Sequence, residues 1–241
     1  MDILFQDDRL IAVHKPARLL VHRSLIDKGA SEFALQLVRD MIGQWVYPVH
    51  RLDRPTSGVL LFARDPATAR ALVAQFSAGR VSKTYRAIVR GHTETAGTID
   101  YALREETDRI ADARADPDKP PQPAVTLYRR LATLELPYAV GRYRTARYSL
   151  LELEPKTGRR HQLRRHLKHI FHPIIGDTTH GDGRHNQFFR EHFGNRRLLL
   201  VATRLCLDHP ASGQRLTIEA PPADDFQRVV QALGLTVSNN S

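Results

Sequence analysis

The segment His50-Arg51-Leu52-Asp53-Arg54-Pro55-Thr56-Ser57-Gly58 leads directly into the apolar run Val59–Ala63. A compact apolar run after a Pro-Thr-Ser-Gly turn predicts a buried strand that begins at the turn. The turn places one carboxylate, Asp53, between the guanidinium groups of Arg51 and Arg54. Because nearby positive charge favours the ionised form of a carboxylate, we expect an ionised Asp53 at a strand edge. On composition alone, an ordinary surface carboxylate in a turn is the commoner interpretation.

Patterns on both sides of this segment predict an α+β fold with a mixed, mostly antiparallel central sheet flanked by helices and loops, because strands outnumber helices and do not alternate strictly with them. The expected strands are Ile3–Phe5, Leu10–His14, Lys83–Val89, Val125–Leu134, Thr145–Leu153, Leu198–Ala202 and Leu216–Ala220. The expected helices are Glu32–Ile42 with Ser31 as N-cap, Ala67–Ala78 capped by Asp65, Arg160–Ile170, and one from Pro222 to Gly234.

The 241 residues are expected to form a single domain over 1–241, with two loops or insertions. The segment 104–123 holds four prolines, and the segment 178–197 carries Gly, Asn and His with little periodicity. No apolar run approaches the roughly 20 residues that cross a bilayer, so no membrane association is expected. A lone cysteine, Cys206, excludes an intramolecular disulfide and fits a reducing cytoplasm, where we expect the protein to be.

The chain is strongly basic, with a formal net charge of +10 and a pI near 10.2. A surplus of this size attracts polyanions, and nucleic acid is the commonest polyanion in a cytoplasm. Evenly spaced His166, His169 and His172 do not converge well on one ion, because Pro173 follows directly after them. The sequence therefore favours a nucleic-acid partner and no metal.

Four segments, in order along the chain, resemble the signatures of the RluA family of pseudouridine synthases. The segment around Asp53 is similar to the signature that carries the catalytic aspartate. The other three are Lys15-Pro16 with Leu20-Val21-His22, then Lys83-Thr84-Tyr85-Arg86-Ala87, then Thr157-Gly158-Arg159-Arg160-His161-Gln162-Leu163-Arg164-Arg165-His166 followed by Pro173-Ile174-Ile175-Gly176-Asp177.

This resemblance implies a catalytic trio and no cofactor. Asp53 would act as a nucleophile or as a base at the ribose, Tyr85 would stack on the flipped uracil, and Arg164 would form an ion pair with Asp53. Without the motifs, Tyr85 would be taken as a core residue and Arg164 as part of a solvated, phosphate-binding helix face. Because uridine isomerisation oxidises nothing and exchanges no group with solvent, it requires no cofactor or metal.

The resemblance also implies residues that hold the RNA. Arg51 would enter the vacancy left by the extruded base, and Leu163 would form part of the apolar wall behind it. Further RNA contacts are expected from Arg54, Lys83, Arg159 and Arg165.

Several loop segments resemble the branch of this family that acts on tRNA, which implies uridine 65 in the acceptor and T-arm region as the target. These segments are Arg54–Gly58, Gly141–Tyr143, Glu154–Gly158, His180–Asp182 and Glu191–Gly194. Two alternatives stay open: a synthase that modifies ribosomal RNA, and an RNA-binding protein that no longer catalyses. We expect a monomer without a protein partner and without an appended N-terminal RNA-binding module, and both predicted loops are expected to touch RNA.

Overall fold

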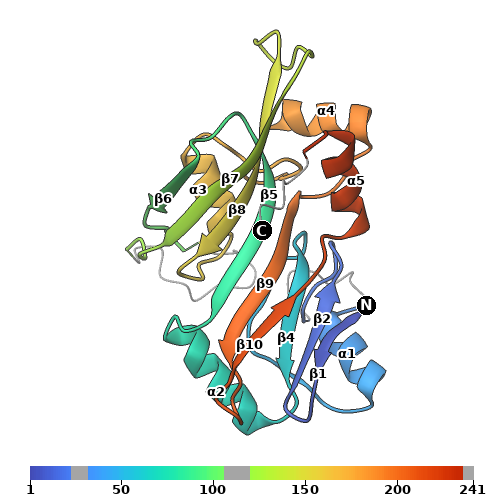
Figure 1. Cartoon of the computed structure of the whole chain (residues 1–241), viewed down its shortest axis with the longest axis vertical. Helices are drawn as coiled ribbons and strands as arrows, with labels where there is room; N and C mark the ends of the chain where they lie inside the picture. Colours follow the sequence, from blue (N-terminus) through green and yellow to red (C-terminus); the bar gives the residue numbers. More distant parts are fainter. Residues whose placement is uncertain (23–31, 106–119, 236–241) are drawn as a thin grey trace. The chain divides into compact units, whose positions relative to one another are not determined.

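The computed structural model describes residues 1–22, 32–105 and 120–235 (Figure 1). The chain divides into two compact units, each of which is described by itself. Unit 1 comprises Met1–Lys83, Ala102–Pro123 and Ala202–Pro221, and unit 2 comprises Thr84–Tyr101, Ala124–Val201 and Pro222–Ser241.

The elements follow the expected α+β pattern. The strands are β1 (Ile3–Gln6), β2 (Leu10–Lys15), β3 (Tyr47–Pro48), β4 (Ser57–Ala63), β5 (Ser82–Arg90), β6 (Ala96–Asp100), β7 (Val125–Leu136), β8 (Ala146–Pro155), β9 (Leu200–Asp208) and β10 (Arg215–Glu219). The helices are α1 (Ala34–Ile42), α2 (Pro66–Ser77), α3 (Gln162–His169), α4 (Gly183–Phe193) and α5 (Asp224–Ala232).

In unit 1, neighbouring strands follow the order β1-β2-β4-β9, with β3 paired to β4 and β10 paired to β9. All seven residues of β4 are buried, which confirms the buried strand expected after the Asp53 turn. Leu10, Leu61 and Leu205 from three strands pack together with Leu72 of α2 in one apolar cluster. The Asp53 turn thus leads directly into a buried strand of this sheet.

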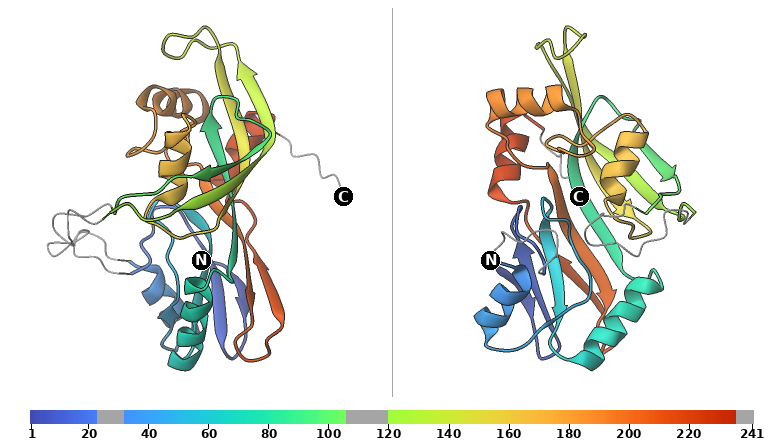
Figure 2. Two further views of the ribbon diagram at one scale, coloured as in Figure 1. Left: turned by 90° about the vertical axis from the view of Figure 1, so that its left-hand side faces the viewer. Right: turned by 180° about the vertical axis from the view of Figure 1, so that it is seen from behind.

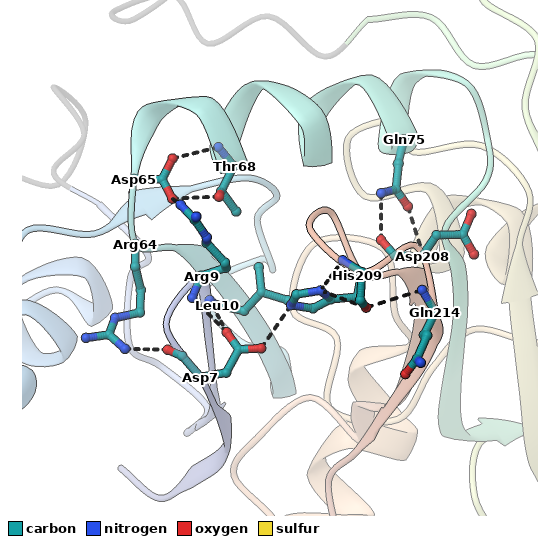
Figure 3. Close-up of polar contacts among 11 residues, drawn as sticks. Asp7, Arg9, Leu10, Arg64, Asp65, Thr68, Gln75, Asp208, His209 and Gln214 are labelled. Atoms are coloured by element: carbon teal, nitrogen blue, oxygen red, sulfur yellow. Dashed lines mark hydrogen bonds and ion pairs between the residues drawn. The ribbon is translucent and has the colours of Figure 1, made fainter.

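Polar contacts fix the far ends of the unit 1 strands (Figure 3). The Asp7 carboxylate accepts hydrogen bonds from the backbone N–H groups of Arg9 and Leu10, at 2.8 and 2.7 Å, and lies 2.9 Å from His209 Nε2. The side chain of Gln75 in α2 exchanges two hydrogen bonds with the backbone of Asp208 in β9, at 2.7 and 3.0 Å. These contacts join the β1–β2 turn and α2 to the end of β9.

In unit 2, the strands follow the antiparallel order β5-β8-β7-β6. The long β7–β8 hairpin is visible in all views of Figures 1 and 2. Leu163 and Leu167 of α3 pack with apolar residues of β5 and β8 in one cluster. A second cluster joins Phe189 of α4 and Phe226 of α5 to Tyr148 of β8. Both clusters hold helices against the sheet that carries Tyr85.

Most of the expected helix limits agree with the structure. Asp65 caps α2 by accepting from the Thr68 N–H at 2.9 Å, and Gly43 ends α1 in the left-handed region. Helix α1 begins at Ala34, and the expected N-cap, Ser31, lies outside the described residues. On α2, Leu72 is fully buried, whereas Val73 next to it is 46% exposed.

The prediction of a loop over 178–197 was wrong, because α4 occupies Gly183–Phe193. Its start is fixed by the Asp182 carboxylate, which accepts from the N–H groups of Arg184 and His185. Its end is fixed by Gly194, in the left-handed conformation. The helix was missed because its buried face combines Phe188 and Phe189 with polar side chains, which weakens the apolar periodicity.

The other expected loop covers 104–123, and its residues 106–119 lie outside the described residues. The tail from residue 236 also lies outside them. Among the described helices, none is long and apolar enough to span a bilayer. The single domain over 1–241 stays a prediction, because each unit is described by itself.

Candidate active site

The Asp53 turn is held by its own backbone and by the turn that follows β2. The Thr56 N–H donates to the Asp53 carbonyl at 3.0 Å, and the Arg18 N–H donates to the Arg54 carbonyl at 2.8 Å. In return, Arg54 Nε donates to the Arg18 carbonyl at 3.1 Å. Asp53 is partly exposed, whereas Leu52 before it is buried and anchors the turn. Arg51 and Arg54, which were expected to hold RNA, are both exposed.

Lys15 supports this turn in a way that the sequence did not reveal. Its side chain is fully buried, and Nζ donates to the carbonyls of Pro16, Leu19 and Arg54 at 2.9, 2.8 and 3.2 Å. A buried ammonium group is costly unless it is hydrogen-bonded, and here three acceptors surround it. Lys15 therefore ties the carbonyl next to Asp53 to the end of β2. The signal in the sequence was a lysine that ends the apolar run Leu10–Val13.

His50 begins the segment as a neutral base. Its ring stacks on Phe76 with the centroids 5.0 Å apart, and Nε2 accepts the Leu61 N–H at 2.9 Å. The residue as a whole keeps some exposure, but burial of the imidazole, with a smaller effect from the Lys83 charge, lowers the pKa of His50 to about 3. Burial also lowers the pKa of Lys83. The structure thus places Lys83 close to the start of the Asp53 segment.

Gly58 ends the turn at a point where the backbones of two strands nearly touch. Its φ is +117°, and a Cβ atom there would lie 2.0 Å from the carbonyl oxygen of Ala202 in β9. Both the conformation and the space therefore require glycine. This close approach brings the end of the Asp53 turn against β9.

Tyr85 and Leu163, which were expected to contact the base, lie at one apolar cluster in unit 2. Tyr85 is in β5, opposite Leu153 of β8, and packs against the cluster in which Leu163 is buried. Leu163 is 7% exposed and Tyr85 only partly buried. Leu163 is therefore largely covered by the cluster, whereas Tyr85 is partly exposed.

Helix α3 is oriented by the side chain of Gln162. Its carbonyl oxygen accepts from the Thr157 hydroxyl at 2.7 Å and from the Arg159 N–H at 3.0 Å. Its amide nitrogen donates to the Val125 carbonyl at 2.9 Å. Gln162 thereby fixes the first turn of α3, in which Leu163 and Arg164 are buried. Arg159 is exposed and Arg165 partly exposed, consistent with the predicted phosphate contacts.

Arg164 forms a buried, bidentate ion pair with Asp177. Its Nε and Nη2 donate to the two carboxylate oxygens at 2.7 and 2.8 Å, and Oδ1 also accepts the N–H groups of Thr179 and His180 at 2.9 Å each. Burial alone would raise the pKa of Asp177, but these hydrogen bonds outweigh burial and hold it below its usual value. The expected pairing of Arg164 with Asp53 stays a prediction.

Asn186 of α4 holds the backbone on both sides of that carboxylate. Its Oδ1 accepts the Gly176 N–H at 2.7 Å, and its Nδ2 donates to the Asp177 carbonyl at 2.7 Å. Nearby, His161 Nδ1 lies 3.1 Å from His180 Nε2. The sequence motif that ends at Asp177 does not indicate a role for this residue. The sequence gives no signal for Asn186, because it predicts a loop where α4 lies.

A family model described as RNA pseudouridylate synthase matches residues 9–169, a stretch that contains Asp53, Tyr85 and Arg164. The chain belongs to this family. Its members are RNA pseudouridine synthases, which makes the protein an isomerase and confirms the family and fold class expected from the motifs.

Similar proteins agree with this assignment. The protein is 57% identical over 234 residues to tRNA pseudouridine synthase C of Pectobacterium carotovorum, of which it spans 62% of the length. It is 53% identical to the proteins of the same name from Yersinia pestis and Vibrio cholerae, covering 91% and 96% of them and 97% of this chain. Among solved structures, human RNA pseudouridylate synthase domain containing 4 matches with a TM-score of 0.72 and 27% identity, over 96% of this chain and 92% of that one.

Proposed function

We propose that this protein isomerises uridine to pseudouridine in tRNA, with uridine 65 in the acceptor and T-arm region as its target. The observation that carries the proposal is the identity of 53–57% over nearly the whole chain with proteins named tRNA pseudouridine synthase C. The net charge of +10 supports it, because a basic protein is attracted to RNA before any base is recognised.

Asp53 is the proposed catalytic carboxylate. The reaction breaks the bond between N1 of uracil and C1′ of ribose, turns the base, and joins C1′ to C5. The proton leaves C5 and N1 gains one, so the product has the same atoms as the substrate. Asp53 acts as a nucleophile, or as a base at the ribose. The Lys15 contacts and the Gly58 approach support this role, because they fix the turn that carries the carboxylate.

Tyr85, Leu163 and Arg164 have the roles that the family motifs imply for them. Tyr85 and Leu163 receive the face of the extruded uracil, and Arg164 keeps Asp53 ionised. The bidentate contact with Asp177 supports the part given to Arg164, since it sets the plane of the guanidinium group in advance.

The remaining predicted residues hold the RNA. Arg51 fills the vacancy that the target base leaves in its stack. The exposed Arg54 and Arg159, with Arg165 and Lys83, contact phosphates and contribute affinity that does not depend on sequence.

The test uses transcribed tRNA and ribosomal RNA that lack modifications, with pseudouridine mapped by carbodiimide treatment and primer extension. The wild-type protein is expected to modify the tRNA at uridine 65. Asp53→Asn is expected to lose all modification and to keep its affinity for tRNA. Asp208→Asn is the matched control, because it removes an equally charged but surface-exposed carboxylate.

Three results would contradict parts of the proposal. Modification of ribosomal RNA alone would overturn the tRNA substrate. Modification of a different tRNA uridine would overturn the position. Full activity in Asp53→Asn would overturn the catalytic role of the carboxylate.

A further inference from the structure

The tip of the β7–β8 hairpin, Pro137–Thr145, is a basic and aromatic surface that no part of the proposed reaction uses. It contains two exposed arginines, Arg142 and Arg144, and no carboxylate. Tyr143 is 60% exposed. The Arg142 guanidinium lies 4.9 Å from the centre of the Tyr143 ring and donates to its hydroxyl at 2.7 Å.

The tip is anchored on α4. The ring of Tyr138 lies 5.3 Å from that of Phe188 and 4.9 Å from that of His192. At Gly141, whose φ is +71°, an added Cβ would come within 3.3 Å of Arg184 Nη1. The two elements therefore form one surface within unit 2, as the views in Figures 1 and 2 show for their ribbons.

Positive charge is in excess across this surface. Helix α4 adds the exposed Arg184 on the face that meets the tip, and the single carboxylate of the helix, Glu191, accepts a hydrogen bond from Gln187 at 2.8 Å. At the base of the hairpin, Glu135 is paired with Arg147 at 3.2 Å. At the start of α4, Asp182 is paired with Arg90. The nearby carboxylates are thus engaged, and Arg142, Arg144 and Arg184 make the net charge of this surface positive.

The tip is also far from the residues expected to hold the base. Tyr85 pairs with Leu153, and β8 runs from Leu153 back to Ala146 at the foot of the tip. At roughly 3.3 Å per residue, these seven steps span about 23 Å. A ligand that touches both places must be long, which excludes a free nucleotide.

From these observations, we propose that the hairpin tip and α4 form a second RNA-binding surface, which contacts a helical part of the substrate away from the target uridine. The inference rests on the proposed function for the identity of the RNA. Arg142, Arg144 and Arg184 bind phosphates, and Tyr143 stacks on a base or ribose at the edge of that contact. The surface selects RNAs that extend far enough to reach it.

The test compares binding of two RNAs as a function of salt. One is the full-length tRNA transcript, and the other is a short stem-loop that carries the target uridine alone. The tip variant is Arg142→Ala/Tyr143→Ala/Arg144→Ala, and the control is Arg70→Ala/Arg228→Ala, which removes the same charge from exposed positions on α2 and α5. A third variant, Arg142→Lys/Arg144→Lys, keeps the charge and the exposed ring.

The tip variant is expected to bind full-length tRNA at least about tenfold more weakly than the control. Its slope of log affinity against log salt should be less steep by about 1.8, for two lost phosphate contacts at roughly 0.9 each. On the short stem-loop, the tip variant and the control should agree. The lysine variant should keep the wild-type slope, and all variants should keep the wild-type melting temperature.

Other outcomes separate the two proposals. If the tip variant binds full-length tRNA as the control does, the second surface is wrong while the proposed function stands. If it loses equal affinity for both RNAs, the contact is not distal and the inference is overturned. If the wild-type protein forms no pseudouridine in tRNA, the proposed function fails. The difference in salt slope, which requires no catalysis, still decides the surface.

Discussion

Removing the Asp177 carboxylate should destabilise the protein strongly, because its partner is as deeply buried as the carboxylate. The side chains of Arg164 and Asp177 are 5% and 1% exposed. Removing one partner of a buried ion pair is strongly destabilising, at a cost of about 3–5 kcal/mol. In a chain of this size, each kcal/mol shifts the melting temperature by roughly 2–4 °C. Asp177→Ala is therefore expected to lower the melting temperature by about 6–20 °C.

The measurement is thermal unfolding followed by circular dichroism. Asp208→Ala is the control, since its pair with Arg215 is 38% and 47% exposed and contributes only about 0–1 kcal/mol. The double variant Arg164→Leu/Asp177→Leu should cost less than the single Asp177 change, because no buried charge is left. A melting temperature for Asp177→Ala within the range of the Asp208 control would refute the reasoning.

The same variant carries a prediction about acid. Because the folded pKa of Asp177 lies below its unfolded value of about 3.9, its contribution is complete above that pH and is lost as the pH falls through the folded pKa. Wild type should therefore lose stability below about pH 4 more steeply than Asp177→Ala does.

Three further predictions concern the turn that carries Asp53. His50 has a pKa of about 3 in the folded protein and roughly 6.5 in the unfolded chain, so it takes up its proton mainly on unfolding. The free energy of unfolding therefore falls as the pH drops below about 6.5. At pH 5 the loss measured by chemical denaturation should be at most about 2 kcal/mol, and His50→Phe should remove it. Gly58→Ala should prevent folding or lower the free energy of unfolding by more than about 3 kcal/mol. Gly213 also has a positive φ, but a Cβ there would meet open space, so Gly213→Ala should cost only about 1–2 kcal/mol. Equal losses in the two variants would refute the close approach of Gly58 to Ala202. Lys15→Met should remove one donor from each of the carbonyls of Pro16, Leu19 and Arg54, and should cut pseudouridine formation more than tRNA affinity. Unchanged turnover would show that Lys15 does not hold the turn.

Much of the fold was predictable because its local signals were strong. The all-apolar β4, the Asp65 cap of α2 and the glycine that ends α1 each depend on residues within one element. Helix α4 was not predictable from apolar periodicity. Its stability comes from the Asp182 cap and from Phe188 and Phe189 packing on the rest of unit 2, which a window of sequence does not contain.

The site shows the same division. The motifs picked out Asp53, Tyr85 and Arg164 as a set, whereas their supports came only from tertiary structure. Lys15 lies 39 positions before Arg54, and the carboxylate that holds Arg164 lies 13 positions beyond it. Charge and periodicity do not identify such pairs. Which acceptor a basic residue bonds is set by the folded backbone, which brings particular groups within hydrogen-bonding distance.

The amide of Asn186 has a consequence for protein engineering. Because it bonds the N–H of Gly176 and the carbonyl of Asp177 at once, it imitates a neighbouring strand for one peptide step. Residues 176–193 therefore form a cassette in which helix α4 and the carboxylate loop depend on each other. A chimera that exchanges α4 with a relative's segment should function only if the whole cassette moves together, and not when the helix alone is grafted.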